Sequence, residues 1–175
     1  MGHCIIIGQT ESGKSTLATK LAEWYHRHGV GVAVLDPMKD PRWPADYITD
    51  DADAFLAFVR DPEQCLQCAL FVDESGESID KFNKDFNWLT CRSRHHGHIC
   101  HLITHRAQDI NPSTRAQATT LYIFNVNSED AKQYARDFNC PMIAVEAPYL
   151  PQGTCIKVER FKPAQRIVVF TPRAH

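Results

Sequence analysis

A glycine-rich octapeptide near the start of the chain constrains the fold more than any other sequence feature. It matches the pattern G-x-x-x-x-G-K-[ST], follows the β-branched run 5–7, and precedes a helical pattern that opens at Lys14. In such a loop, glycines let backbone N–H groups close around phosphates, and the helix N-terminus adds positive potential. The predicted nucleotide-binding residues are Gly8, Gln9, Thr10, Glu11, Ser12, Gly13, Lys14, Ser15 and Thr16.

Short apolar runs alternate with helical patterns along the chain, which is typical of an α/β fold with a mostly parallel sheet. Strands are predicted over residues 3–7, 30–35, 69–72, 99–104 and 120–124. Helices are predicted over residues 14–28, 52–60 and 128–138, the last helix of the chain, with a longer one marked by Ile79, Phe82, Phe86 and Leu89. The segments 154–159 and 166–171 are expected to form a C-terminal β-hairpin. We therefore expect one domain, with a P-loop core over residues 1–140 and an extension over residues 141–175.

The apolar run 69–72 ends in two acids, Asp73 and Glu74. An Asp at the end of a buried strand can hold the water shell of Mg²⁺, and the Glu after it can polarise an attacking water. Lys14 is expected to reach the β- and γ-phosphates, and the Ser15 hydroxyl to ligate the metal. The pattern thus predicts ATP and Mg²⁺ as cofactors, Ser15 and Asp73 as metal residues, and Glu74 as general base.

Charge is unevenly distributed along a chain with the composition of a folded domain. Its 175 residues are 43% hydrophobic and 23% charged, which excludes a disordered or collagen-like chain. The net charge of −2 gives no overall attraction to nucleic acid. Positive charge is local, with +4 over residues 81–106 and +4 over residues 157–175, against −9 over residues 36–80. The basic segments are candidates for phosphate contacts, although solvated surface is an equally good interpretation of the tail alone.

Seven cysteines without a signal-peptide pattern indicate reduced thiols in a cytoplasmic protein. No run approaches the ~18 consecutive apolar residues of a membrane helix, so no membrane insertion is expected. Cys65-x-x-Cys68 is half of a structural zinc site, and a segment rich in candidate ligands follows it, with Cys91, His95, His96, His98, Cys100 and His101. However, Cys68 abuts a predicted strand, and no second pair has finger-like spacing. We therefore favour small buried thiols over zinc.

A basic segment, 91–97, leads into the fourth predicted strand, and the polar passage 104–115 follows it. Here the chain resembles the FtsK/HerA superfamily of DNA-pumping ATPases, particularly the genome-packaging ATPases of membrane-containing bacteriophages. The resemblance covers roughly residues 3–138. It implies a RecA/ASCE-like P-loop NTPase fold, a three-layer sandwich around a mostly parallel sheet.

The resemblance also implies further catalytic residues. His105 stands where that family has a sensor Gln at the end of the fourth strand, and Thr104 is kept beside it as a second candidate. An arginine before this strand enters the neighbouring subunit's site as a finger, for which Arg94 is the first choice and Arg92 the second. Arg115 is a candidate for contacts with phosphates in its own subunit.

The function implied by the resemblance is an ATP-driven nucleic-acid translocase, most specifically a viral DNA-packaging motor. Its expected partners are double-stranded DNA, further copies of the chain in a ring such as a hexamer, and a portal-vertex or capsid protein. The expected location is the host cytoplasm, including the packaging vertex of the virion. The alternative is a small-molecule or nucleotide kinase, which shares the P-loop and a similar length.

Overall fold

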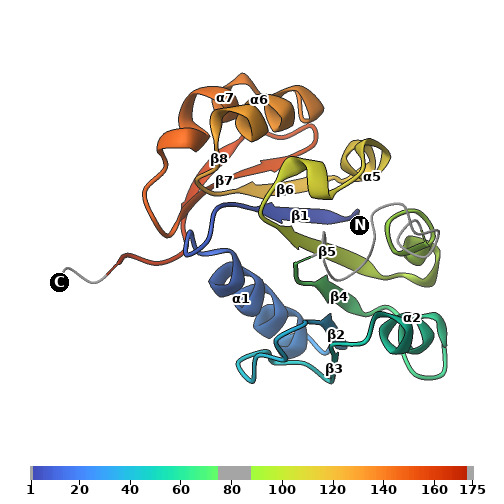
Figure 1. The fold of residues 1–175 in the computed structure, drawn as a ribbon. Coiled ribbons are helices and arrows are strands. Elements are labelled where there is room, and N and C mark those ends of the chain that lie inside the picture. Colours follow the sequence, from blue (N-terminus) through green and yellow to red (C-terminus); the bar gives the residue numbers. More distant parts are fainter. Residues whose placement is uncertain (1, 75–87, 173–175) are drawn as a thin grey trace.

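One mixed sheet of eight strands runs through the centre of the computed structural model, which describes residues 2–74 and 88–172 (Figure 1). The spatial order is β3-β2-β4-β5-β1-β6-β7-β8, and β1 to β6 are parallel while β7 and β8 each run antiparallel to the preceding strand. The strands are β1 (Cys4–Ile7), β2 (Val32–Leu35), β3 (Tyr47–Thr49), β4 (Ala69–Val72), β5 (Ile99–Thr104), β6 (Thr120–Ile123), β7 (Thr154–Glu159) and β8 (Gln165–Val168).

Helices cover both faces of this sheet (Figure 1). The α-helices are α1 (Lys14–Arg27), α2 (Ala52–Arg60), α5 (Pro112–Gln117), α6 (Ser128–Asp137) and α7 (Pro141–Glu146). Short turns of other helix types are η1 (Trp88–Arg92), η2 (Ser93–His96), η3 (Ala107–Asp109) and η4 (Ala147–Tyr149). Within the described ranges, no helix is long and apolar enough to cross a membrane.

Alternate side chains of the strands enter two separate hydrophobic cores, because successive residues of a strand point to opposite faces. In β1, Ile5 and Ile7 pack into the core that α2, α6 and α7 cover, whereas Cys4 and Ile6 pack into the core that α1 covers. All four β1 side chains are buried. The predicted three-layer α/β architecture and the C-terminal antiparallel strand pair are therefore confirmed.

Several predicted elements need correction. The sequence pattern missed β3, because its half-buried Tyr-Ile-Thr shows no run of apolar residues, and it missed the polar helix α5. The helix over 128–138 is not the last one, since α7 follows it. The strand predicted over 166–171 corresponds to β8, which ends at Val168. Ile79, Phe82 and Phe86 lie outside the described residues, and Leu89 lies in the π-helical turn η1.

Two buried histidines, His101 in β5 and His3 just before β1, should make the protein less stable in acid. The His101 ring stacks on Phe71 with centroids 4.3 Å apart, and burial lowers the pKa of His101 from 6.5 to about 4. Burial, aided by Arg94, also lowers the pKa of His3 to about 4. Because unfolding lets both rings take up protons, their contribution to stability is full above pH 6.5 and is lost as the pH falls towards 4.

Each histidine is expected to add up to ~1.4 kcal/mol per pH unit to this slope. Urea unfolding between pH 7 and 4.5 measures it. His101→Gln should remove about half of the histidine-dependent slope, whereas the exposed control His95→Gln should leave it unchanged. An unaltered slope in His101→Gln would contradict the assignment.

Candidate functional site at the carboxyl edge of the sheet

Two glycines of the loop after β1 lie where a side chain would collide with buried neighbours. A Cβ atom on Gly8 would come within 2.5 Å of Ser12 Oγ and 2.6 Å of Phe124 Cβ. Gly13 has a φ of 118°, and a Cβ there would meet ring carbons of Phe170 at 2.9 Å and of Phe124 at 3.0 Å. Packing and backbone conformation together thus account for both glycines of the motif.

The loop leads directly into α1, whose first turn suits an anion. Gly13 is the N-cap and provides no side-chain cap, and the first turn contains no acidic residue. The N–H groups of this turn and the positive end of the helix dipole therefore face the loop without a competing carboxylate. Ser15 and Thr16, in the same turn, are exposed.

Lys14 connects this loop with the end of β5. Its ammonium Nζ donates to the carbonyls of Gly8 at 2.8 Å and Gln9 at 2.9 Å, and lies 3.3 Å from His105 Nδ1. Burial lowers the pKa of Lys14 to about 8, while the negative charges of Asp73 and Glu74 oppose that shift. The lysine therefore lies close to the acids after β4 and next to the histidine after β5.

The two acids after β4 occupy an unusual stretch of backbone. The Asp73 N–H donates to the Leu35 carbonyl at 2.9 Å, and Asp73 Oδ1 accepts the Glu74 N–H at 2.9 Å. Glu74 has a φ of 47°, a left-handed conformation that costs energy for any residue with a Cβ. Such strain is common where a side chain must be aimed at a site.

Burial, together with the nearby charges of Asp36 and Glu74, raises the pKa of Asp73 to about 6. Lys14 and the Glu74 N–H act in the opposite direction. A partly buried carboxyl with this pKa becomes a stable anion when a cation lies beside it, so Asp73 and the exposed Ser15 hydroxyl suit a divalent metal ion such as Mg²⁺.

A cavity of about 750 Å³ opens beside these residues. Its wall includes Gln9 and Thr10 of the loop, Glu74 after β4, and His105 after β5. Since the Lys14 ammonium donates to Nδ1 of His105, this imidazole is the tautomer that carries its proton on Nε2. Further polar side chains that the sequence prediction left out complete the wall, namely Arg106, Gln108, Asp109 and Asn127.

The other sensor candidate, Thr104, also lines this cavity, but its hydroxyl is bound within the loop after β5. Its buried hydroxyl lies 2.8 Å from Asp109 Oδ2, to which it donates, and the same oxygen accepts the Arg106 N–H at 3.1 Å. The Thr104 hydroxyl therefore holds the loop after β5 in place. Of the two sensor candidates, His105 is the one whose side chain lies next to Lys14.

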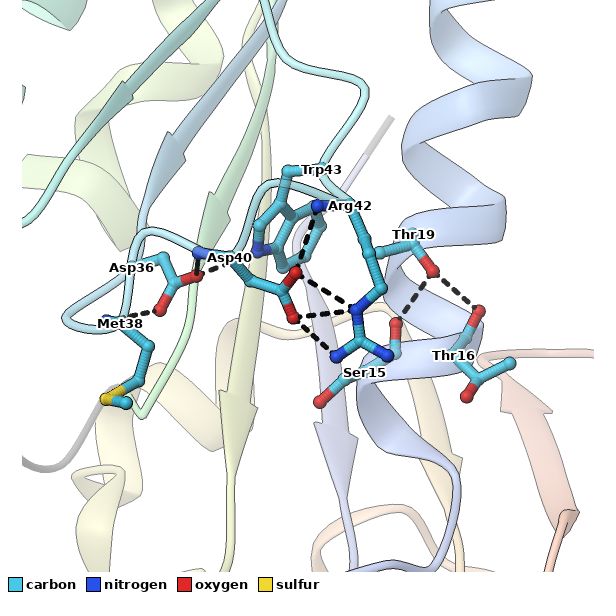
Figure 2. Close-up of polar contacts among 8 residues, drawn as sticks. All are labelled: Ser15, Thr16, Thr19, Asp36, Met38, Asp40, Arg42 and Trp43. Carbon is cyan, nitrogen blue, oxygen red and sulfur yellow. Dashed lines mark hydrogen bonds and ion pairs between the residues drawn. The ribbon is translucent and has the colours of Figure 1, made fainter.

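Asp36, directly after β2, is a buried acid that the sequence prediction missed, and its charge acts on the pKa of Asp73. It is only 2% exposed, and its carboxylate accepts the N–H groups of Met38 and Asp40 and the Trp43 indole N–H at 3.1 Å (Figure 2). The same loop carries Arg42, whose guanidinium binds the Asp40 carboxylate (Figure 2). Like Asp73, Asp36 directly follows a buried apolar strand, which is the signal that could have revealed it.

The C-terminal strand pair supports the phosphate loop from the other side. The Gly153 N–H donates to the Ser12 carbonyl at 3.0 Å, and the Gln152 side chain donates to the Glu11 carbonyl at 2.9 Å. Lys20 of α1 donates to the Val169 carbonyl at 2.7 Å. Residues beyond 150 are therefore part of the structural support of the loop.

The predicted arginines do not join this cavity. Arg115 is buried, with its Nε 2.6 Å from Asp137 Oδ2 and its Nη1 donating to the carbonyls of Ala107 and Ile110. These bonds give Arg115 a structural role between α5 and α6, and not the predicted position at the phosphates of its own subunit.

Arg92 and Arg94 are exposed, before β5 at the amino edge of the sheet. Arg94 is close enough to His3, which precedes β1, to affect its pKa. The four residues of β1 separate this edge from the phosphate loop by about 13 Å. Neither arginine lies at the cavity of its own chain.

The basic tail is partly neutralised within the chain. Lys157 and Lys162 both pair with Glu159, and Arg166 pairs with Glu146. The other basic segment, 81–106, lies partly outside the described residues.

No protein-family model and no curated protein matches this chain. Solved structures do match. The genome-packaging NTPase B204 of Sulfolobus turreted icosahedral virus 2, in complex with AMPPCP, has a TM-score of 0.78 at 15% identity over 94% of this chain and 96% of its own. VirB4 of Thermoanaerobacter pseudethanolicus has a TM-score of 0.66 at 11% identity, over 98% of this chain and 90% of its own. The conjugation coupling protein TcpA of pCW3, with ATPγS, has a TM-score of 0.70 at 13% identity, over 95% of this chain and 59% of its own.

At these identities the likeness shows the fold. The chain has the α/β fold of P-loop NTPases. The sequence resemblance to the FtsK/HerA superfamily fits this set of structures, which includes a viral genome-packaging NTPase and a conjugation coupling protein.

Proposed function

We propose that the chain is a Mg²⁺-dependent ATPase that moves nucleic acid, most specifically the motor that packages a viral DNA genome. The observation that carries the proposal is that Glu74 and His105, which follow β4 and β5, line one polar cavity with the phosphate-loop residues Gln9 and Thr10, while the Lys14 ammonium lies 3.3 Å from His105. B204, a genome-packaging NTPase that is similar in structure over 94% of this chain, supports the choice of cargo.

In this proposal each side chain has one role in hydrolysis. Lys14 and the N–H groups of the first turn of α1 bind the β- and γ-phosphates, and Nε2–H of His105 donates to the γ-phosphate or to the attacking water. The Glu74 carboxylate orients that water and accepts its proton. Ser15 and Asp73 would hold Mg²⁺, which would supply positive charge to offset the negative charge of the phosphates.

The proposed assembly is a ring, such as a hexamer, because Arg94 lies at the opposite sheet edge from its own cavity and can act only on a neighbour. Double-stranded DNA is the proposed track, bound through phosphates without a sequence code. A portal-vertex or capsid protein is the proposed docking partner.

The test is steady-state ATP hydrolysis with and without long double-stranded DNA. We expect turnover that requires Mg²⁺, rises on addition of DNA, and is lost in Lys14→Ala. Lys39→Ala is the matched control, because this lysine is exposed and pairs with Asp50. Phosphate transfer that appears only when nucleosides or other small acceptors are added would instead identify a kinase.

A further inference from the structure

Two thiols and an imidazole meet at the amino edge of the sheet, opposite the phosphate loop. Cys65 and Cys68 lie in the connection between α2 and β4, and His98 immediately precedes β5. Their ligand atoms all lie within 4.8 Å of one another. The three residues are 2%, 8% and 1% exposed. The sequence pattern favoured separate buried thiols here, but the fold brings His98 to the Cys-x-x-Cys pair.

Two tightly packed loops impose this arrangement. Gln67, between the cysteines, has a φ of 56° and donates its N–H to the His96 carbonyl at 3.3 Å. Gly97 has a φ of 77°, and a Cβ on it would lie 2.7 Å from Gln67 Cγ. A left-handed residue inside Cys-x-x-Cys turns the chain so that both sulfurs reach the same side, at the conformational cost of a non-glycine residue.

The tautomer of His98 places the lone pair of Nδ1 towards the two cysteines. Its Nε2 lies 3.1 Å from the Val59 carbonyl, which can only accept, so the proton is on Nε2. The Nδ1 lone pair accepts the Cys68 N–H at 3.0 Å. A histidine that ligates a metal typically donates its other N–H to a backbone carbonyl in this way. The Val59 carbonyl thus already orients the ring as such a ligand.

We propose that Cys65, Cys68 and His98 bind a zinc ion, with water as the fourth ligand. Two sulfurs and one imidazole nitrogen are ligands that zinc prefers, and Cys-x-x-Cys is a usual spacing. A tetrahedral zinc ion places its ligands roughly 3.5–3.8 Å apart, so the three atoms must draw together by up to about 1 Å. The ion replaces the Cys68 N–H as the partner of Nδ1.

Zinc binds cysteine as the thiolate, so occupation of the site releases the thiol protons of Cys65 and Cys68. Two thiolates then balance the charge of the dication in a buried site.

The proposed ion has a structural role that bears on the nucleotide site. It ties the start of β4 to the start of β5, and the other ends of these strands carry Glu74 and His105. The zinc would therefore fix the relative position of the two strands that aim side chains into the cavity.

The test measures metal in the full chain and does not depend on ATP hydrolysis. Protein purified without chelator should contain about one zinc per chain, as should Cys140→Ser, whose cysteine lies at the N-cap of α7. Cys65→Ser and Cys68→Ser should lose the metal. Chelation of the wild-type protein should lower its melting temperature, and added Co²⁺ should give a thiolate-to-cobalt charge-transfer band.

The wild-type experiments stand even where the serine variants fail to fold. The proposal is overturned by wild-type protein without stoichiometric zinc and without a cobalt spectrum. It is equally overturned by peptide mapping that finds Cys65 and Cys68 joined as a disulfide in protein purified anaerobically, which would identify a redox pair. The ATPase assay decides the proposed function separately.

Discussion

Glu74→Gln is expected to bind ATP as tightly as the wild-type protein and to hydrolyse it ~10²–10⁴-fold more slowly, the usual contribution of a general base. Glutamine keeps the size of the side chain and its hydrogen bonds but cannot accept a proton from water. The left-handed backbone at this position is equally strained for both residues, so the structure should not change. Binding of a fluorescent ATP analogue and single-turnover hydrolysis separate the two effects.

Glu63→Gln is the matched control, because Glu63 is exposed in the turn after α2, away from the cavity. It should hydrolyse ATP at the wild-type rate. If Glu74→Gln retained that rate, the proton would go elsewhere, and the role proposed for Glu74 would be wrong. If it lost nucleotide binding as well, Glu74 would be part of the binding site and not the base.

Arg94→Ala is expected to lower turnover ~10³-fold or more in the assembled ring, the effect of removing an arginine finger. Arg94 lies at the edge of the sheet opposite its own phosphate loop, so its effect must come from the neighbouring subunit. Mixing two inactive variants, Arg94→Ala and Glu74→Gln, should therefore restore activity. In a randomly mixed ring, about a quarter of the interfaces join an intact Glu74 to an intact Arg94.

Arg136→Ala provides the control, since Arg136 is exposed on α6. It should be active alone and should not change the recovery. Failure of the mixture to regain turnover, with ring assembly verified by light scattering, would exclude a finger at Arg94. If Arg92→Ala were inactive alone and regained turnover when mixed with Glu74→Gln, Arg92 would be the arginine finger.

The phosphate loop, β4 and the end of α1 could be predicted because each depends on a local pattern in the sequence. The phosphate loop has glycines where side chains would collide, and this requirement can be recognised from the eight residues of the motif alone. The buried strand before Asp73 is a continuous apolar run, so β4 was predicted with its observed bounds. The helix predicted over residues 14–28 is α1, and Gly29, just after it, adopts the left-handed φ of 72° that is common after the end of a helix.

What the sequence did not reveal depends on contacts between distant segments. Arg115 looked like a phosphate ligand, but its partner Asp137 lies 22 positions away and becomes a neighbour only when α5 packs near α6. The link between His98 and the Cys65–Cys68 pair requires β4 and β5 to be adjacent and parallel. Helix α5 is polar throughout, and only Asn111 as N-cap followed by Pro112 signals its start.

The hydrogen bond from the Gly153 N–H to the Ser12 carbonyl also has a consequence for folding during synthesis. The phosphate loop is synthesised before Gly153 and Phe170, which support it. A nascent chain that lacks Gly153 and Phe170 leaves Gly13 uncovered where these residues pack against it. It also lacks β7, the antiparallel neighbour of β6. Competence to bind nucleotide should therefore arise only after β7 and β8 have been made, so a chain that lacks them would not engage ATP before its strands can assemble.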